Sequence, residues 1–162
     1  MSGVLRSLCL ATVLSGAVAA ATADEAAVRF ADGAATFQAN CAVCHRANGA
    51  GTPGLAPPVR VYAPKFIATS EGRAQLAMTV LYGMYGDIVV DERHYNFKMP
   101  EFSRFDDATI AAVLNHVAFD LGGAPASTPA FTAADVAAQR THVVDGDAVR
   151  QHRMVAIGSL AP

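Results

Sequence analysis

Two cysteines and a histidine stand at a spacing that can attach a porphyrin to the chain. Cys41 and Cys44 are three positions apart, and His45 follows directly. On one helical turn, each thiol can add to a vinyl group of a porphyrin lying across that turn, which leaves the histidine beneath the iron. A neutral imidazole nitrogen is the usual proximal ligand of haem iron. The run therefore predicts one covalently attached c-type haem.

Other interpretations of this run fit less well. A thioredoxin-like redox pair lies between a strand and a helix of a βαβ unit, which the surrounding sequence does not predict. A structural zinc site needs four ligands, usually including a second cysteine pair. The remaining cysteine is Cys9, near the start of the chain. We therefore favour haem attachment.

The first 23 residues have the form of an export signal. Arg6 precedes an uncharged apolar stretch over 8–21, and residues 21–23 have the small-x-small form of a cleavage site. The stretch is shorter than the roughly 20 apolar residues that cross a bilayer. We expect residues 1–23 to be cleaved together with Cys9, which would leave a periplasmic protein with no membrane span.

The length and net charge of the chain limit the number of domains and the classes of partner that it can bind. Cleavage leaves 139 of the 162 residues, which suits one domain. The chain has a formal net charge of −2 and no basic run, so nothing favours binding to nucleic acid. The net charge selects no protein partner, because docking depends on where charges lie around a haem edge.

Periodicity and turn residues predict the elements that would hold the haem. A first helix is expected over about 27–41, and the glycine- and proline-rich segment 46–64 is expected to be a loop on the proximal side. A middle helix is predicted over 71–82, followed by a small hairpin over 88–96. The hairpin would present the loop that contains Met99.

The clearest helix begins after Asp106 and carries apolar residues at helical spacing as far as Leu121. Thr132 and Asp135 then form a capping-box pattern that predicts one short helix through about Arg140. We divide the chain into a signal at 1–23, a haem domain at 24–123 and a C-terminal extension at 124–162. The extension is expected to pack on the domain, because its apolar residues need cover. These are Phe131, Val136, Val143 and Val144.

Over about residues 30–122 the chain resembles class I bacterial cytochrome c domains. The features that carry the resemblance are Gly33 and Phe37 before the Cys41–His45 run, Gly49-Ala50-Gly51, Pro57-Pro58, Lys98-Met99-Pro100-Glu101-Phe102, and the helix from Asp106 through Val117. The resemblance implies an all-α cytochrome c fold, in which small helices wrap around one covalent haem c. A minor β-hairpin would precede the methionine loop.

The resemblance also implies the remaining iron ligand. Met99 stands where the family has its distal ligand, and a thioether favours ferrous iron and closes the sixth position. The competing sulfurs are those of Met78, Met84 and Met154. The backbone carbonyl of Pro57, or less readily that of Pro58, is expected to accept a hydrogen bond from His45. The alternative is that both prolines only stiffen the loop.

Two departures from the family pattern leave questions open. His116 stands where relatives often have an aromatic residue, so it is either a hydrogen-bonded core residue or a second histidine ligand. The chain has no tryptophan, which many relatives place near a haem propionate. The residues that could replace it are Tyr62, Tyr82, Tyr95 and Arg60. The remaining histidines, His94, His142 and His152, are expected on the surface.

The residues and the resemblance together predict electron transfer rather than catalysis. The protein would be a periplasmic one-electron carrier, or the haem subunit of a respiratory-chain dehydrogenase or terminal oxidase, and the extension favours a dedicated redox partner. The alternative is a haem enzyme or gas sensor with an open distal site, against which a ligated Met99 would argue. A third possible function is that of a structural protein that uses the haem only to form its core.

Overall fold

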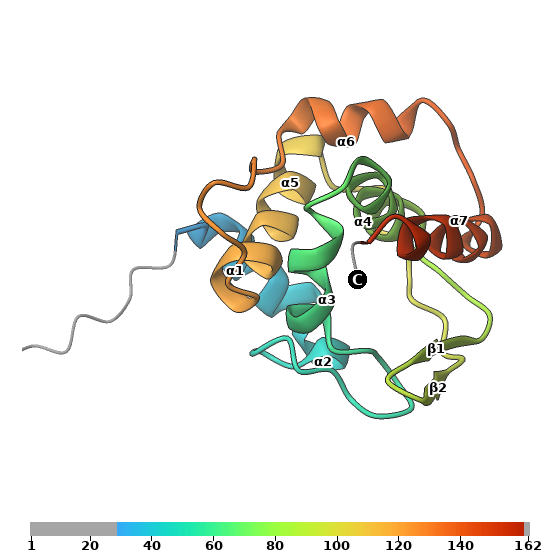
Figure 1. Ribbon diagram of the computed structural model, residues 1–162. Helices are drawn as coiled ribbons and strands as arrows, with labels where there is room; N and C mark the ends of the chain where they lie inside the picture. The colour runs from blue at the N-terminus through green and yellow to red at the C-terminus, as the bar shows by residue number, and fades with distance from the viewer. Residues whose placement is uncertain (1–28, 161–162) are drawn as a thin grey trace, which may run out of the picture.

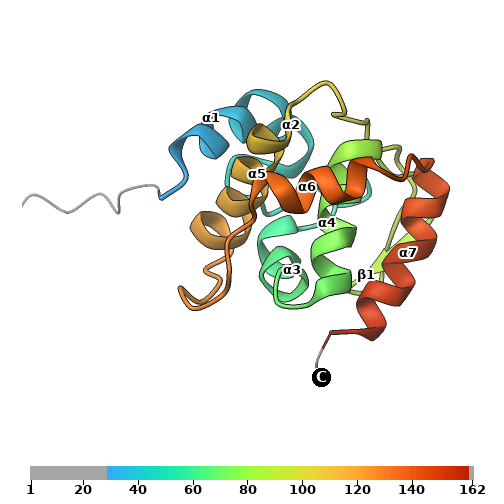
Figure 2. The same ribbon diagram turned by 90° about the horizontal axis from the view of Figure 1, so that it is seen from above.

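The computed structural model describes residues 29–160, which form a mainly helical protein with one small hairpin (Figures 1 and 2). The elements in chain order are α1 (Ala31–Asn40), α2 (Ala42–His45), α3 (Val59–Phe66), α4 (Ser70–Tyr82), β1 (Ile88–Val90), β2 (Arg93–Tyr95), α5 (Asp107–Asn115), the π-helix η1 (His116–Leu121), α6 (Ala133–Arg140) and α7 (Gly146–Gly158). The all-α fold with a minor hairpin is confirmed. The predicted signal at 1–23 lies outside the described residues.

Helices α1 and α5 cross at Gly33. A Cβ atom at this position would lie 2.0 Å from the carbonyl oxygen of Ala112, so a side chain would force the helices apart. Next to the crossing, the rings of Phe37 and His116 pack with centroids 5.6 Å apart. Buried His116 also bonds through Nδ1 to the Asp120 carboxylate at 2.9 Å. It therefore fills the place of an aromatic residue in the core.

Helix α4 lies at the centre of the domain, in contact with α3, α5, α6 and α7. It begins after Thr69, whose side chain accepts a hydrogen bond from the Gly72 backbone N–H at 3.0 Å. It ends at Gly83, whose φ of 71° suits a residue without a side chain. The middle helix is therefore present as predicted, with Ala77 and Leu81 fully buried.

Helix α3 was not expected, because its residues fall partly within the predicted loop 46–64. Proline marks both its N-cap, Pro58, and its interior, Pro64. In so short a helix, Pro64 removes a single backbone hydrogen bond, the one to the Arg60 carbonyl. The burial of Ala63 and Phe66 offsets that loss.

The extension has two helices rather than the predicted one. Helix α6 begins with the capping box of Thr132 and Asp135, as expected. Helix α7 begins at Asp145, whose carboxylate accepts a hydrogen bond from the Ala148 backbone N–H at 2.8 Å. Helix α7 has no clear apolar periodicity in the sequence, because exposed apolar residues such as Met154 and Val155 obscure its buried face.

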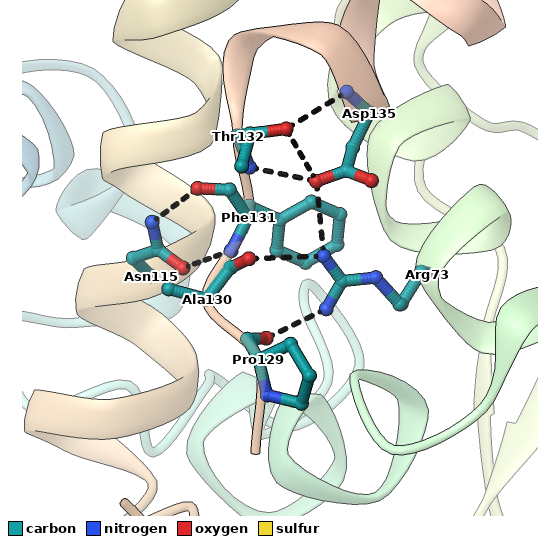
Figure 3. A network of polar contacts seen from close by, with 7 residues as sticks. All are labelled: Arg73, Asn115, Pro129, Ala130, Phe131, Thr132 and Asp135. Carbon is teal, nitrogen blue, oxygen red and sulfur yellow. Dashed lines mark hydrogen bonds and ion pairs between the residues drawn. The ribbon is translucent and has the colours of Figure 1, made fainter. Parts of the chain in front are cut away.

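Polar contacts attach the start of the extension to α4 and α5 (Figure 3). The Asn115 side chain donates to the Phe131 carbonyl at 3.0 Å and accepts from the Phe131 backbone N–H at 2.7 Å. The Arg73 guanidinium lies over the Phe131 ring and bonds to the Asp135 carboxylate at 3.0 Å. Phe131 and Val136 are buried as expected, whereas Val143 is exposed.

Candidate haem site

One cavity of about 230 Å³ brings together the residues that the sequence singled out. Cys41, Cys44, His45, Pro57 and Met99 all line it. Most of the other lining side chains are apolar and come from the loop before α3, from α3 and α4, from the hairpin, and from α5 and η1. They include Leu55, Phe66, Val80, Ile88, Leu114 and Val117.

The attachment run is a tight turn at the junction of α1 and α2. The Cys41 backbone N–H donates to the Phe37 carbonyl at 2.8 Å, and the His45 N–H donates to the Cys41 carbonyl at 2.9 Å. These bonds place both thiols and the imidazole on successive positions of one turn. The side chain of His45 is buried.

The imidazole of His45 is oriented by the following loop. Its Nδ1 lies 3.1 Å from the Pro57 carbonyl oxygen, which accepts the Nδ1–H hydrogen bond and leaves Nε2 as the unprotonated ring nitrogen. Burial lowers the pKa of His45, while the hydrogen bond to Pro57 opposes that shift. The loop itself turns at Gly51, whose φ is 72° and whose N–H donates to the His45 carbonyl at 2.9 Å.

Met99 is held by the chain that leaves α4. Met99 and Met84 form an antiparallel bridge, with the Met99 N–H donating to the Met84 carbonyl at 2.8 Å and the reverse bond at 3.2 Å. A Cβ atom at Gly83 would lie 2.4 Å from the Met99 carbonyl oxygen, so the bridge needs glycine there. Met84 also lines the cavity, whereas Met154 is exposed.

The β1–β2 hairpin closes on a two-residue turn without glycine. Asp91 and Glu92 have φ angles of 50° and 61°, the left-handed values that such a turn requires. The Tyr62 hydroxyl donates to the Asp91 carboxylate. This hydrogen bond raises the pKa of Tyr62 to about 12, with a smaller contribution from burial. The hairpin is therefore tied to α3 across one edge of the cavity.

The surroundings of the thiols are unlike those of a redox-active cysteine pair. Burial, with a smaller contribution from Cys44, raises the pKa of Cys41 to about 11. Redox-active pairs have lowered thiol pKa values. Between residues 29 and 160, no group of three or more His, Cys, Asp or Glu side chains is arranged to hold a metal ion.

The histidines other than His45 lie elsewhere. His116 is bonded to Asp120 and does not line the cavity. His94 and His142 are exposed, as expected. His152 is only partly exposed, because its Nδ1 bonds to the Gln75 side-chain oxygen at 2.8 Å.

The residues predicted near a propionate divide into two groups. Tyr62 and Tyr95 line the cavity, whereas the Tyr82 hydroxyl donates to the Gln139 carbonyl at 2.9 Å and Arg60 is exposed outside it. The polar residues that line the cavity also include Gln75 and Arg153, which no sequence pattern indicates. Only a long-range contact could reveal them, because no local motif marks either residue.

The cytochrome c family model matches residues 30–118. The chain belongs to the cytochrome c family. It is also 44% identical over 94 residues to two proteins named cytochrome c-552, one from Thermus thermophilus and one from a particular strain of the same species. The match covers 58% of this chain, 71% of the first relative and 63%, less than two thirds, of the second.

Membership confirms the class I mono-haem resemblance and the covalent haem c, and it makes this cytochrome an electron-transfer protein. The residues fit the group, because an apolar cavity contains a thiol pair, an oriented imidazole and a thioether. Among the described helices, none has the length and apolar character needed to cross a membrane.

Proposed function

We propose that this cytochrome is a periplasmic one-electron carrier, or the haem subunit of a dehydrogenase or terminal oxidase. Cys41 and Cys44 would hold the haem by thioether bonds, and His45 and Met99 would be the iron ligands. The bound haem supplies one-electron exchange between ferrous and ferric iron. The observation that carries the proposal is the meeting of Met99 with the attachment run in one apolar cavity.

Each residue has a distinct task in this proposal. Pro57 fixes the His45 tautomer, so that Nε2 and not Nδ1 faces the iron. The bridge to Met84 fixes the Met99 backbone, which limits how far its sulfur can move. His45 and Met99 would then supply both iron ligands from the chain, which would leave no iron position for a substrate. This arrangement suits electron transfer and not catalysis.

Two exposed apolar residues indicate where electrons would leave. Val43 and Phe97 both line the cavity, yet 82% of Val43 and 64% of Phe97 are exposed. They therefore mark the cavity rim that a redox partner can approach. Redox partners usually form small, transient contacts. The extension favours a dedicated partner, because a free carrier has no evident need for two additional helices.

The optical spectrum of the exported ferric protein tests the proposal. We expect the far-red sulfur-to-iron band in the wild type, its loss in Met99→Ala and its retention in Met84→Ala, the matched control from the same backbone bridge. The ferrous wild type should not bind carbon monoxide. Loss of the band in Met84→Ala alone would make Met84 the ligand. Carbon monoxide binding by the wild type would instead favour the enzyme or sensor function.

A further inference from the structure

We propose that Arg153 of α7 pairs with a haem propionate, so that the C-terminal extension completes the haem site. The proposal rests on the proposed function, because it needs the haem in this cavity. Arg153 lies beyond residues 30–118, the segment that matches the family, yet it lines the same cavity as His45 and Met99.

Helix α7 is anchored along its length, so the position of Arg153 is fixed by the fold. At its start, the Gly146 carbonyl accepts a hydrogen bond from the Tyr85 backbone N–H at 3.3 Å. At its end, the hydroxyls of Ser159 and Thr69 lie 3.1 Å apart. Between these points, Val149 and Ala156 are completely buried. Helix α7 packs against α4, and Figure 2 shows the two helices side by side.

The residue before Arg153 adds a contact at the cavity itself. His152 bonds to the side-chain oxygen of Gln75, which is only 3% exposed and lines the cavity. The Gln75 side-chain nitrogen in turn donates to the Thr79 hydroxyl at 2.9 Å. These hydrogen bonds hold one turn of α7 next to α4, and that turn carries Arg153.

Arg153 differs from the other arginines of α4, α6 and α7 in its partners. Arg73, Arg140 and Arg150 each form an ion pair with an aspartate. Within residues 29–160, the guanidinium of Arg153 has no ion-pair partner and no hydrogen-bond acceptor. The residue is half-buried, and this burial lowers its pKa. A carboxylate in the cavity would offset the free-energy cost of burying the charged guanidinium, because it can accept two parallel hydrogen bonds from it.

The other polar groups at the cavity are less suited to this role. The Tyr62 hydroxyl already donates its hydrogen bond to the Asp91 carboxylate, so it cannot donate one to a propionate as well. Lys98 lines the cavity but is exposed, and its ammonium lies 5.7 Å from the Tyr85 ring centroid. Arg153 is therefore the best-placed donor for a propionate in this cavity.

The midpoint potential of the exported holoprotein tests the pairing. Removing the guanidinium leaves a carboxylate unpaired, and its negative charge stabilises ferric over ferrous haem. We expect Arg153→Gln to shift the redox equilibrium toward the ferric form by several-fold to about tenfold, where tenfold equals about 59 mV for a one-electron couple. Arg153→Lys, which keeps the charge, should shift it less.

Arg150→Gln is the matched control, because it removes the same charge from the same helix. Arg150 is paired with Asp147 and does not line the cavity, so we expect a shift of less than about twofold. Equal shifts in Arg153→Gln and Arg150→Gln, or no shift in Arg153→Gln with the fold intact, would overturn the pairing.

A vibrational measurement covers the case in which Arg153→Gln loses its haem. The propionate bending mode in the resonance Raman spectrum should change in Arg153→Lys and stay as in wild type in Arg150→Lys. An unchanged mode in Arg153→Lys, or the same change in both variants, would overturn the proposal. Absence of the far-red band from the wild type would instead refute the proposed ligation by Met99, and the Raman comparison would still decide the role of Arg153.

Discussion

The histidine side of the cavity (Cys41, Cys44, His45 and Pro57) and the methionine side (Met84 and Met99) are built differently. His45 is fixed by contacts within twelve residues, the most distant being the Pro57 carbonyl. Met99 depends on a bridge to Met84, fifteen residues earlier, and therefore on where α4 ends and how the hairpin returns. The histidine side can form from contacts between residues close in sequence, whereas the methionine side forms only when α4, the hairpin and the following loop have come together. We expect the methionine side to open first under stress.

Breaking the histidine side should have the largest effect. In Cys41→Ala/Cys44→Ala, no thioether bond can form, so we expect complete loss of covalently bound haem and, with it, much of the core. Haem staining of the denatured protein, together with its intact mass, measures this loss. Cys9→Ala is the control, because Cys9 falls in the predicted signal and should leave attachment unchanged. Covalent haem in the double variant would refute the attachment site.

Gly83→Ala should break the methionine side while the histidine side stays intact. The new Cβ would meet the Met99 carbonyl at 2.4 Å on a residue with a φ of 71°. We expect loss of the far-red band, new binding of carbon monoxide, and destabilisation by about 3 kcal/mol. Covalent haem should remain.

Gly123→Ala is the control for this variant. Gly123 has a φ of 69° with no atom within 4 Å of the added Cβ, so it measures the backbone strain alone, about 1–2 kcal/mol. Equal effects of Gly83→Ala and Gly123→Ala on the far-red band would show that the bridge does not hold Met99.

Gly51→Ala should weaken the histidine side without detaching the haem. Its Cβ would lie 2.7 Å from the Pro57 carbonyl oxygen, the group that accepts the His45 hydrogen bond. We expect a changed iron–histidine stretching frequency in the ferrous resonance Raman spectrum of a Met99→Ala background, where that mode is observable. Destabilisation should be about 2 kcal/mol.

Gly54→Ala provides the matched comparison for Gly51→Ala. It shares a positive φ, 76°, and its added Cβ has no neighbour within 4 Å. An identical stretching frequency in Gly51→Ala and Gly54→Ala would mean that Pro57 does not orient His45.

The smallest expected effect is an acid loosening of the extension. Burial would raise the pKa of Asp135, but hydrogen bonds from Thr132 and the charge of Arg73 outweigh it, so the pKa lies below its usual value. A group whose pKa is lower in the folded state stabilises the folded protein at pH values above its pKa in the unfolded state, which is about 3.9 for aspartate. That stabilisation is lost as the pH falls through the folded-state pKa.

Acid should therefore loosen α6 before it affects the histidine side. The free energy of unfolding should fall less steeply below about pH 4 in Asp135→Asn than in the wild type, since the variant lacks this titration. Denaturant unfolding between about pH 2.5 and 6 measures the two slopes. If the free energy of unfolding falls equally steeply with pH in the wild type and in Asp135→Asn, Asp135 does not link stability to pH.

The sequence predicts those features that adjacent residues determine. The spacing of Cys41 and His45, the capping box at Thr132 and the N-cap at Asp106 are each complete within five residues, and the structure has a helical turn or helix start at each. The site assignments themselves remain proposals. The hairpin is also present, although Asp91 and Glu92 take left-handed angles that glycine adopts more easily.

What the sequence could not predict depends on distant partners. Helix α3 forms despite Pro58 and Pro64 because the domain buries Phe66, and that burial is not visible locally. Arg153 reaches the cavity only because α7 returns across α4, through contacts such as that between His152 and Gln75. A single arginine in an amphipathic pattern gives no indication of such a return.

The helix crossing at Gly33 also has a consequence for the order of folding. It joins α1 to Ala112, about 80 residues later, and closing a loop of that length costs chain entropy before the contact repays it. The crossing should therefore form late, after α4 and α5 have reached their places. Since Gly33 has no side-chain rotamer to arrange, the helices need only align their backbones at this step, so no side-chain ordering is added to the entropy cost of closing the loop.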